Sequence, residues 1–133
     1  MKGCLFSFIM DPYSSMIITA VQAVKNAVVK IDVYKTVQGK MSPAGSGSGF
    51  VFSSDGLIFT NSHVVNGAEK IMVSLLNENE IEAQLIGIDA DTDLAILKIY
   101  TSGYSTAKMG DSSQLQIGQL VIAIGNPLGY QHT

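Results

Sequence analysis

Apolar residues recur at two different spacings along the chain, and the change of spacing divides it into two parts. Within residues 14–25 the spacing is that of one face of an α-helix, shown by Ile17, Ile18, Val21 and Val24. Ser14 or Ser15 is expected to cap the start of this helix. From residue 27 onward, β-branched and apolar residues alternate with polar ones, which predicts strands.

Seven short segments after the helix have the composition of strands. They are residues 27–34, 49–52, 57–61, 71–75, 80–88, 94–99 and 120–124. Asp55-Gly56 lies between two of these segments and is a strong signal for a hairpin turn. Residues 76–79 are expected to form the turn of a second hairpin. Seven short strands with at most one helix predict a small antiparallel barrel or sandwich.

Two stretches between these segments contain no clear strand pattern. Residues 35–45 are polar and include Pro43, so we expect a loop. The glycine-rich residues 45–49 are neither followed by Gly-Lys-Ser/Thr nor placed before a helix, so they do not form a phosphate-binding loop. We interpret them as a flexible approach to the next strand.

Composition limits the function classes that remain open. The chain has 133 residues, 47% hydrophobic and 14% charged, which suits one folded domain. The net charge is −3, and the sequence contains no Arg and no basic run, which argues against a nucleic-acid partner. Cys4 is the one cysteine, so no internal disulfide forms, and no spacing suggests a metal or other cofactor.

Targeting signals are weak in this sequence. Residues 1–10 resemble the start of a signal peptide only faintly, because Asp11 and Pro12 interrupt the apolar run and no cleavage pattern follows. No run of 18 apolar residues occurs, so no transmembrane segment is expected. These features leave the compartment undetermined.

The two histidines, His63 and His132, are the first candidates for chemistry. A histidine that acts as a general base needs a carboxylate on its second ring nitrogen, which fixes the tautomer and stabilises the imidazolium. Asp89, Asp91 and Asp93 precede the strand at 94–99. Asp93 is nearest to the apolar strand and therefore most easily buried, whereas the other two are expected to face solvent. This pattern alone leaves a catalytic and a structural role equally open.

Several motifs resemble, in order and spacing, the HtrA family of trypsin-like serine proteases. They are Gly47-Ser48-Gly49-Phe50-Val51, residues 56–65 with Thr60-Asn61-Ser62-His63, Thr92-Asp93-Leu94-Ala95-Ile96-Leu97-Lys98, Gly110-Asp111-Ser112-Ser113-Gln114-Leu115 and residues 118–129 with Gly125-Asn126-Pro127-Leu128-Gly129. They cover roughly residues 45–133, and the helix and strand at 14–34 also fit the start of the family's protease domain.

The resemblance implies an all-β fold, an antiparallel six-stranded trypsin-like barrel with a short amino-terminal helix. It implies that His63 is the general base and Asp93 its orienting carboxylate. Family members place the active site between two such barrels, and the second supplies the nucleophilic Ser and the oxyanion hole. The expected layout is a leading segment at 1–27, the first barrel at 28–125 and the start of the link to a second barrel at 126–133.

The sequence departs from the family where the second barrel would begin. It contains no Gly-Asn-Ser-Gly-Gly-Pro, so the chain is expected to be an amino-terminal half that is inactive alone. Gly110-Asp111-Ser112-Ser113 resembles a nucleophile motif but lacks the two following glycines that orient oxyanion donors. We interpret it as a turn capped by Asp111 or Ser112.

The resemblance also implies substrates, assembly and location. HtrA proteases cleave unfolded or damaged polypeptides, commonly form trimers through their amino-terminal segments, and are extracytoplasmic or periplasmic. Residues 13–28 are the candidate assembly element. The alternative hypothesis is a non-catalytic protein-binding module built on a stand-alone first barrel. A cysteine protease on the same fold is disfavoured because Cys4 precedes His63, whereas that nucleophile belongs to the second barrel.

Overall fold

The computed structural model describes residues 11–75 and 79–125. Its elements in chain order are α2 (Pro12–Val24), β1 (Val28–Val37), β2 (Lys40–Val51), β3 (Leu57–Thr60), α3 (Ser62–Val65), β4 (Lys70–Ser74), β5 (Glu80–Asp89), β6 (Leu94–Lys98) and the 3₁₀ turn η1 (Ser112–Gln114). Cys4, His132 and the proposed link at 126–133 lie outside the described residues, as do residues 76–78 of the second hairpin.

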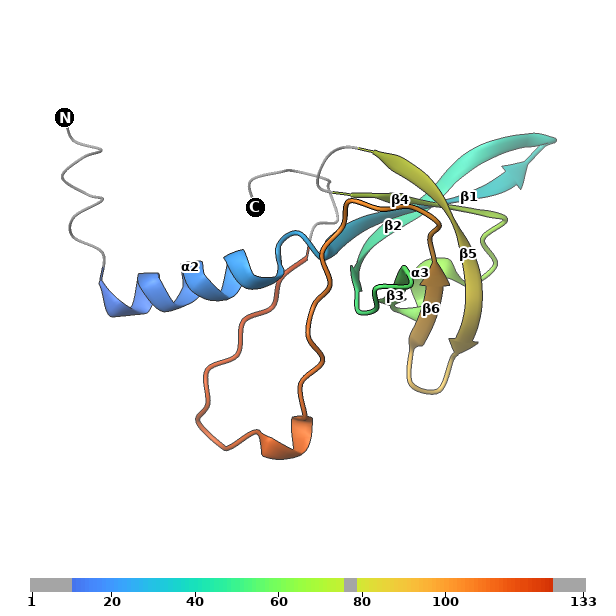
Figure 1. Ribbon diagram of the computed structural model, residues 1–133. Helices are drawn as coiled ribbons and strands as arrows, with labels where there is room; N and C mark the ends of the chain where they lie inside the picture. The colour runs from blue at the N-terminus through green and yellow to red at the C-terminus, as the bar shows by residue number, and fades with distance from the viewer. Residues whose placement is uncertain (1–10, 76–78, 126–133) are drawn as a thin grey trace.

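The six strands form a closed antiparallel barrel in the order β1-β2-β3-β6-β5-β4 (Figure 1). Pairing of β1 with β4, from Lys30↔Ser74 to Tyr34↔Lys70, closes it. The expected all-β, six-stranded antiparallel barrel with an amino-terminal helix is thereby confirmed. Closure matters for stability because it leaves no strand of the barrel as an unpaired edge.

Alternating side chains fill the inside of the barrel. The buried core consists of Val29, Ile31, Val33, Val51, Ile58, Val65, Ile71, Val73, Leu75, Ala95, Leu97 and Ile99. Burying one Val, Leu or Ile side chain contributes roughly 1.5–3 kcal/mol. The period-two alternation of the sequence is therefore the main determinant of which face of each strand points inward.

The loop expected at residues 35–45 is instead a continuation of the hairpin. β1 runs to Val37, and β2 begins at Lys40. Gln38 and Gly39 join them with φ angles of 53° and 79°, as in the two-residue turns that match the twist of a hairpin. Figure 1 shows this hairpin extending beyond the neighbouring strands. The signal was weak because Gln, unlike Asn or Asp, rarely occupies such a turn.

The interpretation of residues 45–49 as flexible was also wrong. They lie within β2, paired with β1 from Val33↔Gly45 to Val29↔Gly49. A Cβ atom at Gly49 would lie 2.7 Å from the Phe59 carbonyl oxygen. Glycine is needed here because two backbones approach closely.

The amino-terminal helix forms as expected, but a different residue caps it. The Asp11 carboxylate accepts hydrogen bonds from the Ser14 backbone N–H and hydroxyl, both at 2.7 Å. Pro12 occupies the first turn, where its missing N–H costs nothing. No residue of α2 is buried, and the helix extends away from the barrel (Figure 1). None of the described helices is long and apolar enough to span a membrane.

The seventh strand, expected at residues 120–124, is absent from the described part of the chain. After β6, residues 99–125 contain only η1, and Val121 is 72% exposed. The physical reason is the closure of the barrel by β1 and β4, which leaves this segment no strand edge to pair with. The turn at η1 agrees with the sequence interpretation, because Asp111 accepts a hydrogen bond from the Ser113 backbone N–H at 3.0 Å.

Candidate active site

The barrel brings together two residues that are far apart in sequence. β3 pairs with β6, and the Thr60↔Ala95 pair sets the end of one strand beside the start of the other. α3 begins directly after β3 and carries His63, while Asp93 lies directly before β6. Strand register therefore places the imidazole and the carboxylate side by side.

The carboxylate of Asp93 bonds to His63 twice. Its Oδ2 lies 2.7 Å from His63 Nδ1, and its Oδ1 accepts the His63 backbone N–H at 2.9 Å. The Ser62 hydroxyl donates to the same Oδ1 at 2.9 Å. A proton held on Nδ1 by this carboxylate leaves Nε2 with a free lone pair, which is the form that a general base requires.

The backbone of Asp93 is held as firmly as its side chain. Its φ of 56° lies in the left-handed region, which costs a non-glycine residue about 1–2 kcal/mol. Its carbonyl oxygen accepts hydrogen bonds from the Ser62 backbone N–H and from Asn61 Nδ2, both at 3.1 Å. These hydrogen bonds thus offset the cost of the left-handed backbone conformation and fix the direction of the carboxylate.

A family model for a trypsin-like peptidase domain matches residues 47–133. The chain belongs to this family. Relatives named "probable periplasmic serine endoprotease DegP-like" occur in Pseudomonas savastanoi pv. phaseolicola and Halomonas elongata, each 49% identical over 87 residues. A relative of the same name in Hahella chejuensis is 44% identical over 96 residues.

These alignments cover unequal shares of the two chains. The first two relatives align with 65% of this chain but 18% of their own length, and the Hahella relative with 72% and 20%. The chain therefore spans about a fifth of the length of the curated relatives it matches. Together with the family model, they confirm the resemblance to HtrA-type proteases and place these residues in the amino-terminal part of a trypsin-like peptidase.

Electrostatics at this candidate site favour the charged carboxylate. The His63 backbone N–H, followed by the His63 ring and the Ser62 hydroxyl, lowers the pKa of Asp93 below its ordinary value. The burial expected for Asp93 is only partial, since its side chain is 42% exposed and that of His63 is 70% exposed. Hydrogen bonding, rather than exclusion of water, is what holds the pair in this chain.

Of the other two candidate aspartates of the peptidase domain, Asp89 has a structural role. Asp89 accepts hydrogen bonds from the Asp91 backbone N–H at 3.1 Å and from the Thr92 hydroxyl at 2.9 Å, which closes the β5–β6 turn. Asp89 and Asp91 are both exposed. Across residues 11–75 and 79–125, no group of three His, Cys, Asp or Glu side chains could hold a metal ion.

Acid is expected to destabilise this peptidase domain. Hydrogen bonds lower the pKa of four carboxyl groups: Asp11, Glu69, Asp93 and Asp111. The unfolded chain therefore binds protons at a higher pH than the folded chain. The stability these groups contribute is present above their ordinary values, 3.8 for Asp and 4.5 for Glu, and is lost as pH falls through the lower folded-state pKa values.

Urea denaturation between pH 7 and pH 3 measures this effect. The free energy of unfolding is expected to change little down to about pH 5 and to decrease at lower pH. Asp93→Asn removes one of the four titrating groups and is expected to make the pH dependence shallower. A free energy of unfolding that stays constant to pH 3 would contradict the lowered pKa values of these four carboxyl groups.

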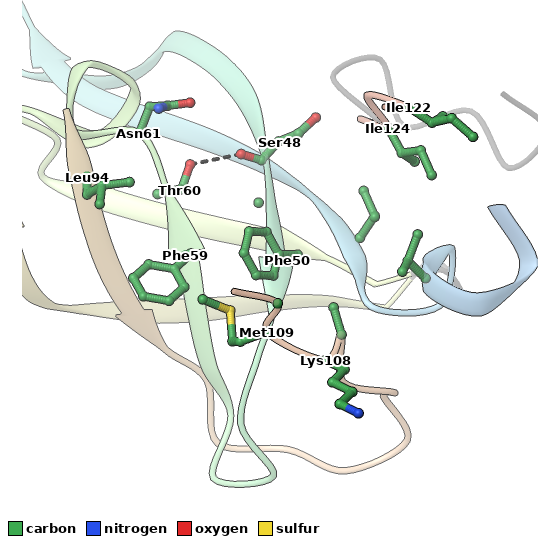
Figure 2. A pocket seen from close by; sticks show the side chains of 15 residues that line it. Ser48, Phe50, Phe59, Thr60, Asn61, Leu94, Lys108, Met109, Ile122 and Ile124 are labelled. Carbon is green, nitrogen blue, oxygen red and sulfur yellow. Dashed lines mark hydrogen bonds between the residues drawn. The ribbon is translucent and has the colours of Figure 1, made fainter. Parts of the chain in front are cut away.

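An apolar pocket of about 580 Å³ lies next to the site in this peptidase domain. Figure 2 shows Phe50, Phe59 and Met109 along it, with Ile122 and Ile124 on the opposite side. It includes the direct sequence neighbours of the site, Asn61 and Leu94, but neither His63 nor Asp93. The outer face of β2 and β3 is therefore apolar and accessible beside the His–Asp pair.

Sequence reasoning selected His63 and Asp93 but missed their supporting residues. Asn61 and Ser62 both bond to Asp93, through its carbonyl and its carboxylate respectively. Their signal was present as two consecutive polar residues between an apolar strand and the histidine. Polar residues at a strand end are common in turns, so their position alone did not distinguish them.

Proposed function

We propose that this chain supplies the general base and its orienting carboxylate to a serine endopeptidase. The observation that carries the proposal is the 2.7 Å contact between His63 Nδ1 and Asp93 Oδ2. In this mechanism His63 Nε2 accepts the proton of a serine hydroxyl as that oxygen attacks the peptide carbonyl carbon. Asp93 stabilises the resulting imidazolium, which then protonates the leaving amine.

The nucleophile of this mechanism is proposed to come from other residues than these 133. The sequence contains no Gly-Asn-Ser-Gly-Gly-Pro. The nearest resemblance, Ser112, opens the η1 turn that Asp111 caps, and no pair of glycines follows it to orient oxyanion donors. The proposed layout keeps residues 1–27 as a leading segment, 28–125 as the first barrel unit and 126–133 as a link to the nucleophile-bearing part.

The chain by itself is therefore expected to be inactive. Residues of a catalytic triad act as a unit, and a base without a positioned nucleophile gives no acceleration from proximity. Treatment with a fluorophosphonate, followed by intact-mass measurement, is expected to show no adduct. A stoichiometric adduct, above all on Ser112, would show that these residues form a complete enzyme.

A chimera tests whether these residues support peptide cleavage when the rest of the protease is present. The 87-residue segment of the Pseudomonas savastanoi relative that aligns with this chain is replaced by the corresponding residues of this chain. The chimera is expected to cleave an unfolded protein substrate, and His63→Ala is expected to abolish cleavage. A chimera that folds without activity would instead favour the alternative, a non-catalytic protein-binding module.

The proposed location is supported by the names of the relatives, and the proposed substrates are those that the resemblance to HtrA proteases implies. The relatives are named periplasmic serine endoproteases. We infer that the complete protein acts outside the cytoplasm on unfolded or damaged polypeptides, without cofactor or nucleic acid.

Self-association through α2 is a further part of the proposal. Tyr13, Met16 and Ile18 on this helix are 60%, 48% and 40% exposed, and none of its residues is buried. Light scattering is expected to show a homo-oligomer, with a trimer as the arrangement known in the family. Met16→Glu should shift the mass toward the monomer, whereas Gln22→Glu, an exposed polar position on the same helix, should not. A monomeric mass at every concentration would contradict this.

A further inference from the structure

The hydroxyl of Ser62 is a buried polar group with a single charged partner. Ser62 is 6% exposed, and its Oγ donates to Asp93 Oδ1 at 2.9 Å. A buried hydroxyl bonded to a carboxylate forms a charge-assisted hydrogen bond, which is stronger than a neutral one. The Ser62 side chain is therefore directed at the carboxylate rather than at its own backbone.

Two hydrogen-bond donors hold one carboxylate oxygen of Asp93 and thereby fix the direction of the other oxygen. Oδ1 of Asp93 accepts both the Ser62 hydroxyl and the His63 backbone N–H at 2.9 Å. Rotation of the carboxyl group about its last bond would break both contacts. Oδ2 is consequently left to face His63 Nδ1, and the plane of the carboxylate is fixed even though 42% of the Asp93 side chain is exposed.

We propose that Ser62 is a positioning residue for the His63–Asp93 pair. It acts through Asp93, by holding the carboxylate ionised and oriented so that the Nδ1-protonated tautomer of His63 is favoured. In a partly exposed site, water competes for the carboxylate, and an additional donor from a buried side chain compensates for that competition. The inference rests on the proposed function, because it is the base role of His63 that requires this tautomer.

A merely structural role for Ser62 is the competing explanation, and Thr60 provides a matched control for it. Thr60 is also 6% exposed, and its hydroxyl donates to the Ser48 carbonyl oxygen at 2.9 Å (Figure 2). It is the last residue of β3 and lies two residues before Ser62, the first residue of α3. Thr60→Val thus removes a buried hydroxyl of equal exposure without touching Asp93.

The test uses nuclear magnetic resonance on this chain, which needs no activity. The carboxyl ¹³C resonance of Asp93 is titrated, and the ¹⁵N shifts of the His63 ring report its tautomer. Ser62→Ala is expected to raise the pKa of Asp93 and to reduce the population of the Nδ1-protonated tautomer. Ser62→Thr, which keeps the hydroxyl, should retain both properties, and Ser62→Cys, a weaker donor, should lie between. Thr60→Val should alter neither.

The outcomes separate this inference from the function on which it rests. Unchanged Asp93 titration and His63 tautomer in both Ser62→Ala and Ser62→Cys would overturn the role of Ser62. If Asp93→Asn nevertheless changes the tautomer of His63, the proposed base and its carboxylate stand without Ser62. If Asp93→Asn also leaves the tautomer unchanged, the proposed function fails as well. Equal effects of Thr60→Val and Ser62→Ala would assign Ser62 a structural role only.

Discussion

Asp93→Asn is expected to lower kcat/KM of the chimera described above by about 10⁴-fold. The amide that replaces the carboxylate can donate toward His63 Nδ1 from its nitrogen, which favours the ring tautomer with the proton on Nε2. That tautomer has no lone pair facing the nucleophile. The amide also carries no negative charge to stabilise the imidazolium. Initial rates on a fluorogenic peptide, at neutral pH and subsaturating substrate, measure the loss.

Asp89→Asn is the matched control for this experiment. Asp89 is an exposed aspartate close to Asp93 in sequence, and its carboxylate bonds to Asp91 and Thr92. The same chemical change at this position is expected to leave kcat/KM nearly unchanged. A loss of less than tenfold for Asp93→Asn, or equal losses for both variants, would rule out Asp93 as the carboxylate that orients the base.

Gly56→Ala is expected to destabilise the barrel by at least about 3 kcal/mol, a large part of the stability of a domain of this size. Gly56 has a φ of 85°, and a Cβ atom at this position would lie 2.3 Å from the carbonyl oxygen of Ile99. The Ile99 backbone N–H donates to the Gly56 carbonyl at 3.0 Å, so the two backbones cannot separate without losing this bond. Urea denaturation followed by circular dichroism measures the change.

Two other glycines separate the contributions of the backbone conformation and of the steric contact to this loss of stability. Gly103 has a φ of 86°, and a Cβ atom there would have no neighbour within 4 Å, so Gly103→Ala should cost only the backbone term, about 1–2 kcal/mol. Gly87 has neither a positive φ nor a close neighbour, and Gly87→Ala should change stability by about 0.5 kcal/mol or less. A Gly56→Ala variant no less stable than Gly103→Ala would show that the contact with Ile99 relaxes freely.

Much of the barrel could be predicted because burial imposes a period of two on β1, β3, β4 and β6, whereas β5 has no buried residue. Residues such as Ile31, Ile58 and Leu97 are fully buried and stand at alternate positions in their strands. The length of the β1–β2 hairpin could not be predicted, because it depends on a Gln-Gly turn whose positive φ angles the sequence signals only weakly. Composition likewise could not show that Gly49 is required by the nearby Phe59 carbonyl rather than by flexibility.

Only part of the candidate site could be predicted from the sequence. His63 and Asp93 stood out because the resemblance to a known family named them, whereas spacing alone left their role open. The left-handed backbone of Asp93, with a φ of 56°, and the hydrogen bond from the Ser62 hydroxyl to its carboxylate are consequences of how α3 meets β6. Such contacts arise from tertiary packing, so no local pattern along the chain encodes them.

The pairing of β3 with β6 also ties the site to the course of folding. β1 and β2 form a local hairpin. By contrast, Leu57 of β3 pairs with Lys98 of β6, which can happen only after α3, β4 and β5 have been synthesised. Such non-local pairing pays its loop-closure entropy before its contacts form and is therefore slow. His63 contacts Asp93 only when β3 and β6 have paired. A newly made chain in which β3 and β6 have not yet paired thus holds His63 apart from Asp93, and formation of the His63–Asp93 contact reports the pairing of these two strands.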